Sequence, residues 1–210
     1  MINKRKFDIR CYALVTSVKG NVKAYFYKEG YLRTSSKEFT LSNLANRMVH
    51  LTNDAVQKHA EDYGKFEPGN KLSYDDFQKY LSLNHGSLKV DFNRDLHPQI
   101  QKIVTDTVRA TFHKLDPQQR MNSFEIFGYD FMLDDAFKIY LIEANTNPCL
   151  ELSSPLLAKL IPSMVENALR IAIDPLFPPP EGYSQKKAML GDICLENKFE
   201  LIFDSRVDGE

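Results

Sequence analysis

Residues 123–145 read "SFEIFGYDFMLDDAFKIYLIEAN", and this stretch decides the predicted fold. Its two arms, 123–133 and 137–145, are rich in aromatic and β-branched residues and flank the short segment "DDA". Two runs of strand composition around a short polar connection are typical of a β-hairpin. Leu141 and Ile142 are predicted to be core residues of the second arm.

Three side chains with oxygen donors lie in this hairpin: Asp130 in the first arm, and Glu143 and Asn145 in the second. Residues two apart on a strand leave the same face, so Glu143 and Asn145 are predicted to point together. Asp130 shares that face if the connection holds an even number of residues, whereas an odd connection without a bulge puts it on the opposite face. Two carboxylates and an amide oxygen that converge suit Mg²⁺. Ordinary solvated acids are the alternative, but the apolar context favours a bound cation because an unpaired buried carboxylate is costly.

The opening of the chain predicts three further strands. Aromatic and β-branched residues alternate over 7–18 and 22–27, and a third strand follows the bend at Gly30. Residues 1–33 carry a local excess of six positive charges, which is either a solvated face or an attractive surface for an anion.

Lys6, Asp8 and Arg10 occupy alternate positions of the first strand and therefore share one face. On a solvent-exposed face they would form an ordinary ion-pair ladder. In a cleft they would bind phosphate and ribose, with the lysine as a point charge and the aspartate as an acceptor for sugar hydroxyls. Both interpretations fit the spacing.

Helices are predicted in three places. Residues 35–90 are mostly polar, with one short helix that begins at a capping box of Ser73 and Asp76. Apolar residues at helical period over 100–115 predict a longer helix. Another helix is predicted to begin after the cap residue Ser154.

The last part of the chain combines helix, spacer and tail. Pro162 is expected to kink or divide the helix that begins after residue 154. The segment "LFPPPEG" at 176–182 is expected to be a stiff spacer, and "KFELIFD" at 198–204 is one more possible strand.

Composition excludes several classes of protein. The chain has 210 residues, of which 43% are hydrophobic, and this is enough for a sizeable core. A net charge of −1 does not favour binding to nucleic acid or to a membrane surface. The three cysteines show no C-x-x-C spacing, so a reducing compartment is expected rather than a disulfide framework or a zinc site. No apolar run approaches a membrane span and no signal peptide is evident, so a cytoplasmic or cytoskeletal location is expected.

Five ordered segments carry a resemblance to a known family. They are "RKFDIRCYALVTS" (5–17), "YFYKEGYLRTSS" (25–36), "VHLTNDAVQK" (49–58), "FEIFGYDFML" (124–133) and "LIEANTNPCLE" (141–151). Together they resemble the tubulin–tyrosine ligase family, ATP-grasp ligases that attach tyrosine, glutamate or glycine to tubulin and some other proteins. The resemblance runs from about residue 4 to residue 178.

The resemblance implies roles for nine residues. Arg10 is placed near the reacting phosphate and Arg33 on the incoming amino acid, and these two are the expected catalytic residues. The expected nucleotide contacts are Lys6, Asp8, Thr52 and Asn53. The expected magnesium ligands are Asp130, Glu143 and Asn145, with Asn145 also close to the amino acid.

The implied fold is α+β and ATP-grasp-like, an antiparallel β-sheet flanked by helices that corresponds to the carboxy-terminal half of the family's catalytic unit. Residues 1–178 would form this partial domain, and 179–210 the Pro-rich spacer and tail. ATP and Mg²⁺ are the implied cofactors, and the implied partners are a free amino acid and the acidic carboxy-terminal tail of tubulin. A cytoskeletal or cilium-associated location follows.

The implied reaction is the ATP-dependent addition of an amino acid to tubulin through an acyl phosphate. The segment "YGKFEPGNKLSYDDFQKYL" at 63–81 favours tyrosine over glutamate, whereas "NTNPCLE" at 145–151 departs from the tyrosine ligase. The alternative is a non-catalytic fragment or pseudo-enzyme that binds tubulin without turnover. The retained site residues favour the ligase, and the absence of the family's amino-terminal segments for the adenine pocket favours the alternative.

Overall fold

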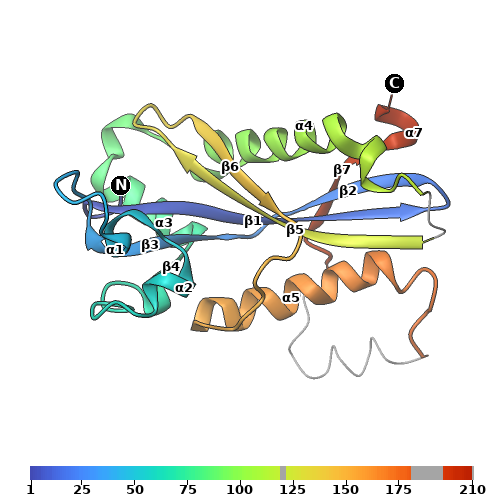
Figure 1. The fold of residues 1–210 in the computed structure, drawn as a ribbon. Helices are drawn as coiled ribbons and strands as arrows, with labels where there is room; N and C mark the ends of the chain where they lie inside the picture. The colour runs from blue at the N-terminus through green and yellow to red at the C-terminus, as the bar shows by residue number, and fades with distance from the viewer. Residues whose placement is uncertain (119–121, 181–195, 210) are drawn as a thin grey trace.

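The computed structural model describes residues 1–118, 122–180 and 196–209, in which one antiparallel seven-stranded sheet lies between helices (Figure 1). In chain order the elements are β1 (Arg5–Val18), β2 (Asn21–Tyr27), β3 (Tyr31–Glu38), α1 (Arg47–His50), α2 (Asp54–Gln57), η1 (Pro68–Asn70), β4 (Lys71–Ser73), α3 (Tyr74–Asn84), η2 (Gly86–Leu88), η3 (Phe92–Leu96), α4 (His97–Leu115), β5 (Asn122–Leu133), β6 (Ile139–Asn145), α5 (Pro155–Ala172), β7 (Phe199–Asp204) and α7 (Ser205–Asp208). The predicted α+β class with an antiparallel sheet flanked by helices is confirmed.

Strand β1 organises the sheet. Its first half pairs with β3 and its second half with β2, while β5 pairs along its other edge. The sheet then extends from β3 to β4, from β2 to β7 and from β5 to β6. The predicted hairpin of residues 123–145 is therefore the β5–β6 pair, and the possible strand of the tail is β7.

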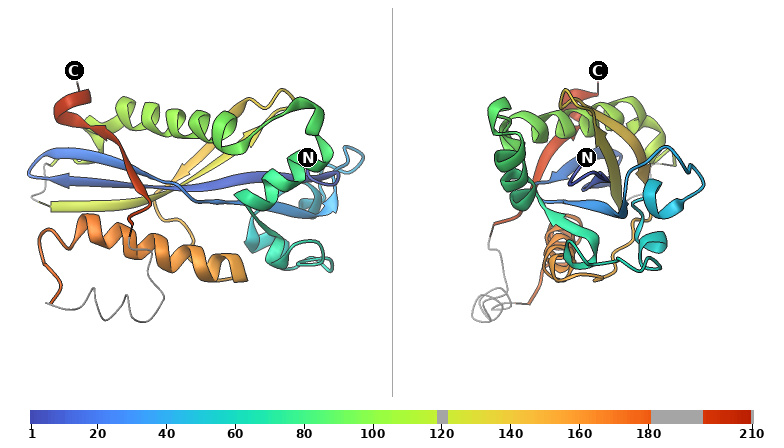
Figure 2. Two further views of the ribbon diagram at one scale, coloured as in Figure 1. Left: turned by 180° about the vertical axis from the view of Figure 1, so that it is seen from behind. Right: turned by 90° about the vertical axis from the view of Figure 1, so that its left-hand side faces the viewer.

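Helices cover both faces of the sheet, which explains why nearly all of β1 is buried (Figure 2). On one face Ile9 packs in a cluster with Ile100 of α4. On the other face Tyr12 packs with Leu157 and Met164 of α5. Because successive side chains of a strand point to opposite faces, a strand covered on both sides is apolar on both sides.

The predicted helix starts are confirmed. Ser73 Oγ accepts a hydrogen bond from the Asp76 amide at 3.1 Å, and Ser154 Oγ accepts one from the Leu157 amide at 3.2 Å. Pro162, however, does not divide α5, which runs unbroken through it. The buried apolar face of α5 packs against the sheet and holds the helix together although a proline removes one helical hydrogen bond.

The prediction that Leu141 and Ile142 are core residues is wrong. Their side chains are 36% and 50% exposed. Strand β6 pairs only with β5 among the described strands, so it lies at an edge of the sheet and its apolar residues are not covered. Position at an edge is a property of the whole sheet and cannot be read from the composition of one strand.

Residues 35–90 hold more regular structure than the one predicted helix. Besides α3 they form α1, α2, β4 and the short turns η1 and η2. The side chains of Asn46 and Asn53 cap α1 and α2. Of the predicted spacer at 176–182, residues 181 and 182 lie outside the described residues. No helix within the described part of the chain is long and apolar enough to cross a membrane.

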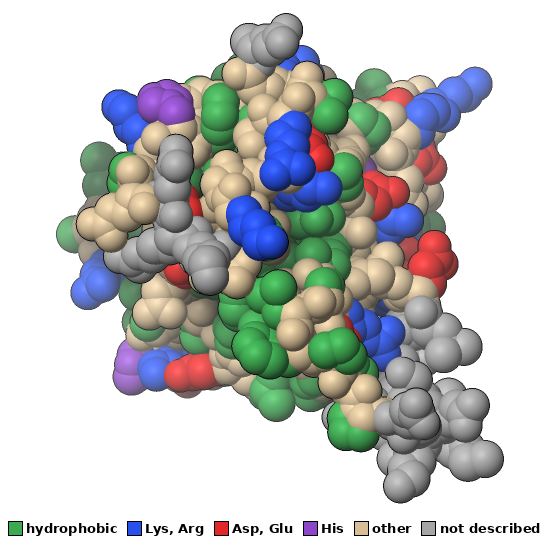
Figure 3. Space-filling model, turned by 90° about the vertical axis from the view of Figure 1, so that its right-hand side faces the viewer, with side chains coloured by type: hydrophobic (Ala, Val, Ile, Leu, Met, Phe, Trp, Pro, Cys, Tyr) green, Lys and Arg blue, Asp and Glu red, His purple; other side chains and the backbone are tan. Residues whose placement is uncertain are grey.

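Apolar side chains also gather at the end of the molecule that carries the β1–β2 turn (Figure 3). The exposed apolar residues of the segments that end there include Val18 at the end of β1 and Phe124 near the start of β5. None of the nine predicted site residues lies on these parts of the strands, so this surface is separate from the site described next.

Candidate active site

Four charged side chains from three neighbouring strands meet on the α5 face of the sheet. Asp8 of β1 lies opposite Arg33 of β3, and Arg10 of β1 lies opposite Asp130 of β5. All four are buried. Lys6, Asp8 and Arg10 are therefore not a ladder on a solvent face, because Asp8 and Arg10 pair with neighbouring strands instead.

Hydrogen bonds join these four groups into one network. Arg33 donates from Nε and Nη2 to the two carboxylate oxygens of Asp8 at 2.7 and 2.8 Å, and its Nη2 also lies 2.7 Å from Asp130 Oδ2. Arg10 donates from Nη2 to Asp130 Oδ2 at 2.9 Å and from Nε to Oδ1. The hydroxyl of Thr52 donates to Asp8 Oδ2. Each guanidinium is thus fixed in orientation by a bidentate pair.

The network keeps Asp130 and Arg33 charged. Burial alone would raise the pKa of Asp130, but the hydrogen bond from Arg10 and the charge of Arg33 hold that pKa below its usual range. Burial likewise opposes the charge of Arg33, yet the carboxylates of Asp8 and Asp130 raise its pKa. The buried carboxylate of Asp130 was expected to need a metal cation for compensation. Two arginines supply that compensation instead.

A β-bulge decides which way the hairpin acids point. From Leu133 to Phe131 strand β5 pairs in one register with β6, and the register then shifts so that Asp130 lies opposite Glu143. Without the shift Asp130 would lie opposite Ile142, and Glu143 would leave the other face. Directly opposed residues of an antiparallel pair share a face, so the bulge puts the two carboxylates on the same face of the hairpin.

This hairpin carries oxygen atoms of the kind that a magnesium ion prefers as ligands. Asn145 Nδ2 donates to Glu143 Oε1 at 3.0 Å, so these two side chains do point together. The amide oxygen of Asn145 takes no part in this hydrogen bond and could act as a metal ligand. Glu143 is exposed, unlike Asp130, and is free to reach an ion. Within residues 1–118, 122–180 and 196–209 no group of three or more His, Cys, Asp or Glu side chains forms a metal cluster, so a site here rests on the two carboxylates and the amide.

A cavity of about 360 Å³ adjoins the network and contains a large share of the predicted site. Arg10, Arg33, Asn53, Glu143 and Asn145 all line it. The remaining acids of the network lie behind the two arginines, to which they are hydrogen-bonded. A concave site with convergent charged groups is the usual form of a small-molecule site.

Lys6 is a predicted site residue that neither lines this cavity nor joins the charged network. Its ammonium donates to the backbone carbonyl of His50 at 2.8 Å, and it does not line the cavity. Thr52 contacts the site only through Asp8. Asn53 lines the cavity while its side chain accepts a hydrogen bond from the Ala55 amide at 2.9 Å, which fixes its position at the start of α2.

One pair of residues in the cavity wall was missed by sequence reasoning. Lys71 Nζ lies 2.7 Å from Asp54 Oδ1, and both residues line the cavity. Tyr63 Oη donates to the same oxygen of Asp54 at 2.8 Å. These residues are distant in sequence and belong to no short motif, so only the pairing of β4 with β3, which sets Lys71 opposite Arg33, reveals them.

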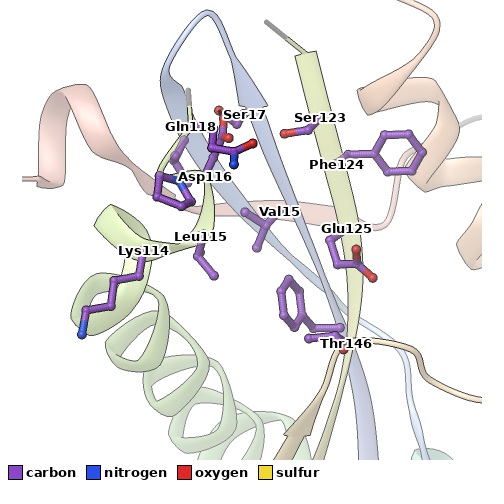
Figure 4. Close-up of a pocket in the computed structure, with 13 residues that line it drawn as sticks. Val15, Ser17, Lys114, Leu115, Asp116, Gln118, Ser123, Phe124, Glu125 and Thr146 are labelled. Atoms are coloured by element: carbon purple, nitrogen blue, oxygen red, sulfur yellow. Dashed lines mark hydrogen bonds between the residues drawn. The ribbon is translucent and has the colours of Figure 1, made fainter. Parts of the chain in front are cut away.

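A second cavity, of about 480 Å³, lies at the far end of β1 between β1, β5 and the end of α4 (Figure 4). Its lining includes Val15, Phe124 and a hydrogen-bonded pair in which Ser17 Oγ donates to Asp116 Oδ2 at 2.7 Å. None of the predicted site residues lines it. The cavity beside the charged network is therefore the candidate active site, although its volume is smaller.

A sequence model of the tubulin-tyrosine ligase family matches residues 1–181. The chain belongs to this family. Similar curated proteins include Tubulin glycylase 3D of Tetrahymena thermophila, which is 32% identical over 177 residues covering 83% of this chain and 17% of the relative. Tubulin glycylase 3B of Drosophila melanogaster is 33% identical over 178 residues, covering 83% of this chain and 23% of the relative. The present chain therefore matches about a sixth to a quarter of the length of these relatives.

Proposed function

We propose that this member of the tubulin-tyrosine ligase family is an ATP-dependent carboxylate–amine ligase that adds an amino acid to tubulin. The observation that carries the proposal is the buried network of Arg10, Arg33, Asp8 and Asp130 beside a cavity that also presents Glu143. Buried arginines that are already oriented by carboxylates are suited to bind anionic groups without further reorganisation. An intact network of this kind favours a working ligase over a pseudo-enzyme.

The arginines divide the substrates between them. Arg33 uses Nε and Nη2 for Asp8 and Asp130, which leaves Nη1 to donate to the α-carboxylate of the amino acid. Arg10 lies one strand further along the row, between Asp130 and the cavity, where it would contact the transferred phosphoryl group. The four predicted nucleotide contacts remain part of the proposal, with Lys6 reaching the nucleotide from outside the cavity.

The proposed reaction has two steps. The acceptor carboxylate of tubulin attacks the γ-phosphorus of ATP, forming an acyl phosphate and releasing ADP. The amine of the amino acid then attacks the acyl carbon, loses a proton and expels phosphate, so that an amide bond forms. The contribution of Arg10 and Arg33 is positioning and electrostatic stabilisation, as in other phosphoryl transfers.

Magnesium would be held by Asp130, Glu143 and Asn145, and when bound it would neutralise phosphate charge. The donor set on the two strands of the hairpin supports this assignment. Both oxygens of Asp130 already accept hydrogen bonds from arginine, so this carboxylate would contribute through its remaining lone pairs.

The names of the similar proteins add glycine to tyrosine and glutamate as a candidate amino acid, and we favour glycine. The proposed acceptor is an acidic tail of tubulin, which suits the positive excess of residues 1–33. A cytoskeletal location would follow from that partner.

The test is ligation of labelled amino acid to purified tubulin with Mg-ATP, using protein from cells that express the complete reading frame. Glycine, tyrosine and glutamate are supplied separately, and ADP release is measured in parallel. Glu143→Gln should abolish incorporation, whereas Glu125→Gln, an exposed glutamate on the neighbouring strand outside this cavity, should not. Failure of all three amino acids to be incorporated would reject the proposal.

A further inference from the structure

We propose that the ion pair of Asp54 and Lys71 is a specificity wall that limits the size of the amino-acid side chain accepted beside Arg33. The inference rests on the proposed ligase function, because it assumes that Arg33 holds the α-carboxylate. It goes further by assigning selectivity to two residues that lie outside the charged network.

The order of the strands places this pair on one side of Arg33. Lys71 of β4 lies directly opposite Arg33 of β3, and β3 in turn pairs with β1. Arg10 and Glu143 lie on the other side, on β1 and β6. Arg33 therefore stands between the wall and the part of the cavity that is proposed to hold phosphate.

The orientation of the amino acid follows from that order. With its carboxylate on Arg33, its amine must face the acyl phosphate near Arg10 to attack it. The Cα substituents diverge tetrahedrally, so the side chain points away from the amine, and we place it on the side of the cavity that Asp54 and Lys71 line. A large side chain would meet the ion pair, and glycine would not.

The wall is fixed in place by contacts on several sides. The Lys71 side chain is only 2% exposed, and its ammonium also donates to the Gly69 carbonyl at 3.0 Å. Asp54 accepts from Tyr63 at 2.8 Å and is further hydrogen-bonded to Ser153, on the segment that leads into α5. A buried ammonium with two partners cannot move aside for a substrate without losing a charge-assisted hydrogen bond.

The experiment compares amino acids of increasing size in the active protein. Wild type should prefer glycine to alanine in kcat/KM by about tenfold or more, the range expected for one extra methyl group in a closed pocket. The double variant Asp54→Ala/Lys71→Ala removes the wall without leaving either charge unpaired. It should raise the ratio of alanine to glycine kcat/KM at least about tenfold.

Two further variants separate size from charge and from misfolding. Asp54→Asn/Lys71→Met keeps the volume of the wall and should keep the wild-type ratio. Lys71→Ala alone removes the lysine side of the wall while Tyr63 still donates to Asp54. It should also raise the ratio of alanine to glycine kcat/KM, and it serves as the test if the double variant does not melt cooperatively. The matched control removes the ion pair of Lys37 and Asp62, which lies outside the cavity, and should leave the ratio unchanged.

The outcomes distinguish the two proposals. Glycine ligation by wild type, with ratios that do not change in either alanine variant, would overturn the wall and leave the ligase function standing. An equal change in the isosteric variant would overturn selection by size. A wild type that ligates tyrosine as readily as glycine would also overturn the wall, and one that ligates no amino acid would reject both.

Discussion

Replacing Arg33 by lysine separates the geometry of the buried network from its charge. Arg33 makes three contacts shorter than 3 Å, two to Asp8 and one to Asp130. A lysine ammonium keeps the positive charge but is a single point, so it cannot form the parallel bonds to Asp8 and still reach Asp130. At least one charge-assisted hydrogen bond is lost, which is worth about 2 kcal/mol.

The expected result of Arg33→Lys is a fall of about 2 kcal/mol in the free energy of unfolding, measured by urea denaturation with far-ultraviolet circular dichroism. With an m-value of roughly 2.5 kcal/mol/M, the urea midpoint falls by about 0.8 M. In the ligation assay the same variant should raise the KM for the amino acid more than the KM for ATP, because lysine lacks the Nη1 group that is proposed to bind the α-carboxylate while Nε and Nη2 hold the acids.

The chain offers a matched control. Arg94 binds Asp95 through the same two nitrogens, at 2.8 and 2.7 Å, but its side chain is 67% exposed. Solvent screens such a pair, so Arg94→Lys should leave the urea midpoint nearly unchanged. Equal midpoint shifts for Arg33→Lys and Arg94→Lys would refute the assignment of a rigid, buried network.

Three further outcomes are expected. Gly30→Ala should lower the free energy of unfolding by about 2 kcal/mol or more in urea titrations, because the new Cβ would overlap both Tyr74 Oη and the backbone oxygen of Arg10. Burial would raise the pKa of Asp130, but the hydrogen bond from Arg10 and the charge of Arg33 lower it in the folded state. The stability that this carboxylate contributes is therefore present above the unfolded pKa of about 3.9 and is lost as pH falls through the folded value. The urea midpoint should therefore drop on acidification below about pH 4, and less steeply in Asp130→Asn. Thr52→Val, which removes the hydroxyl that donates to the buried carboxylate of β1, should cost about 1 to 2 kcal/mol in the same titration.

The sequence predicted the strands and caps because their signals are local. Alternation and aromatic content mark β1, β5 and β6, and the oxygens of Ser73 and Ser154 act on amides three residues away. Burial could not be predicted in the same way. Leu141 and Ile142 resemble core residues in composition, but they are exposed because β6 has a neighbour on one side only among the described strands.

In the site, too, the local features could be predicted from the sequence and the non-local ones could not. Residue types on alternate positions predicted that Asp8 and Arg10 share a face, and five predicted residues do line the cavity. Which face Asp130 takes depends on the bulge, and a spacing of residues does not encode a bulge. The pairing of Asp54 with Lys71 depends on how a polar region folds back on β3, so no local sequence pattern predicts it.

The position of β1 has a consequence for how the charged network unfolds. Residues 9 and 10 are flanked by β3 and β5, and residues 13–18 by β2 and β5, so the strand that carries Asp8 and Arg10 is held on both edges along most of its length. Backbone amides in such a central strand exchange with solvent only when the whole sheet opens. The buried network on β1 is therefore expected to open only together with the sheet. Amide hydrogen exchange around residue 10 should therefore report the global free energy of unfolding.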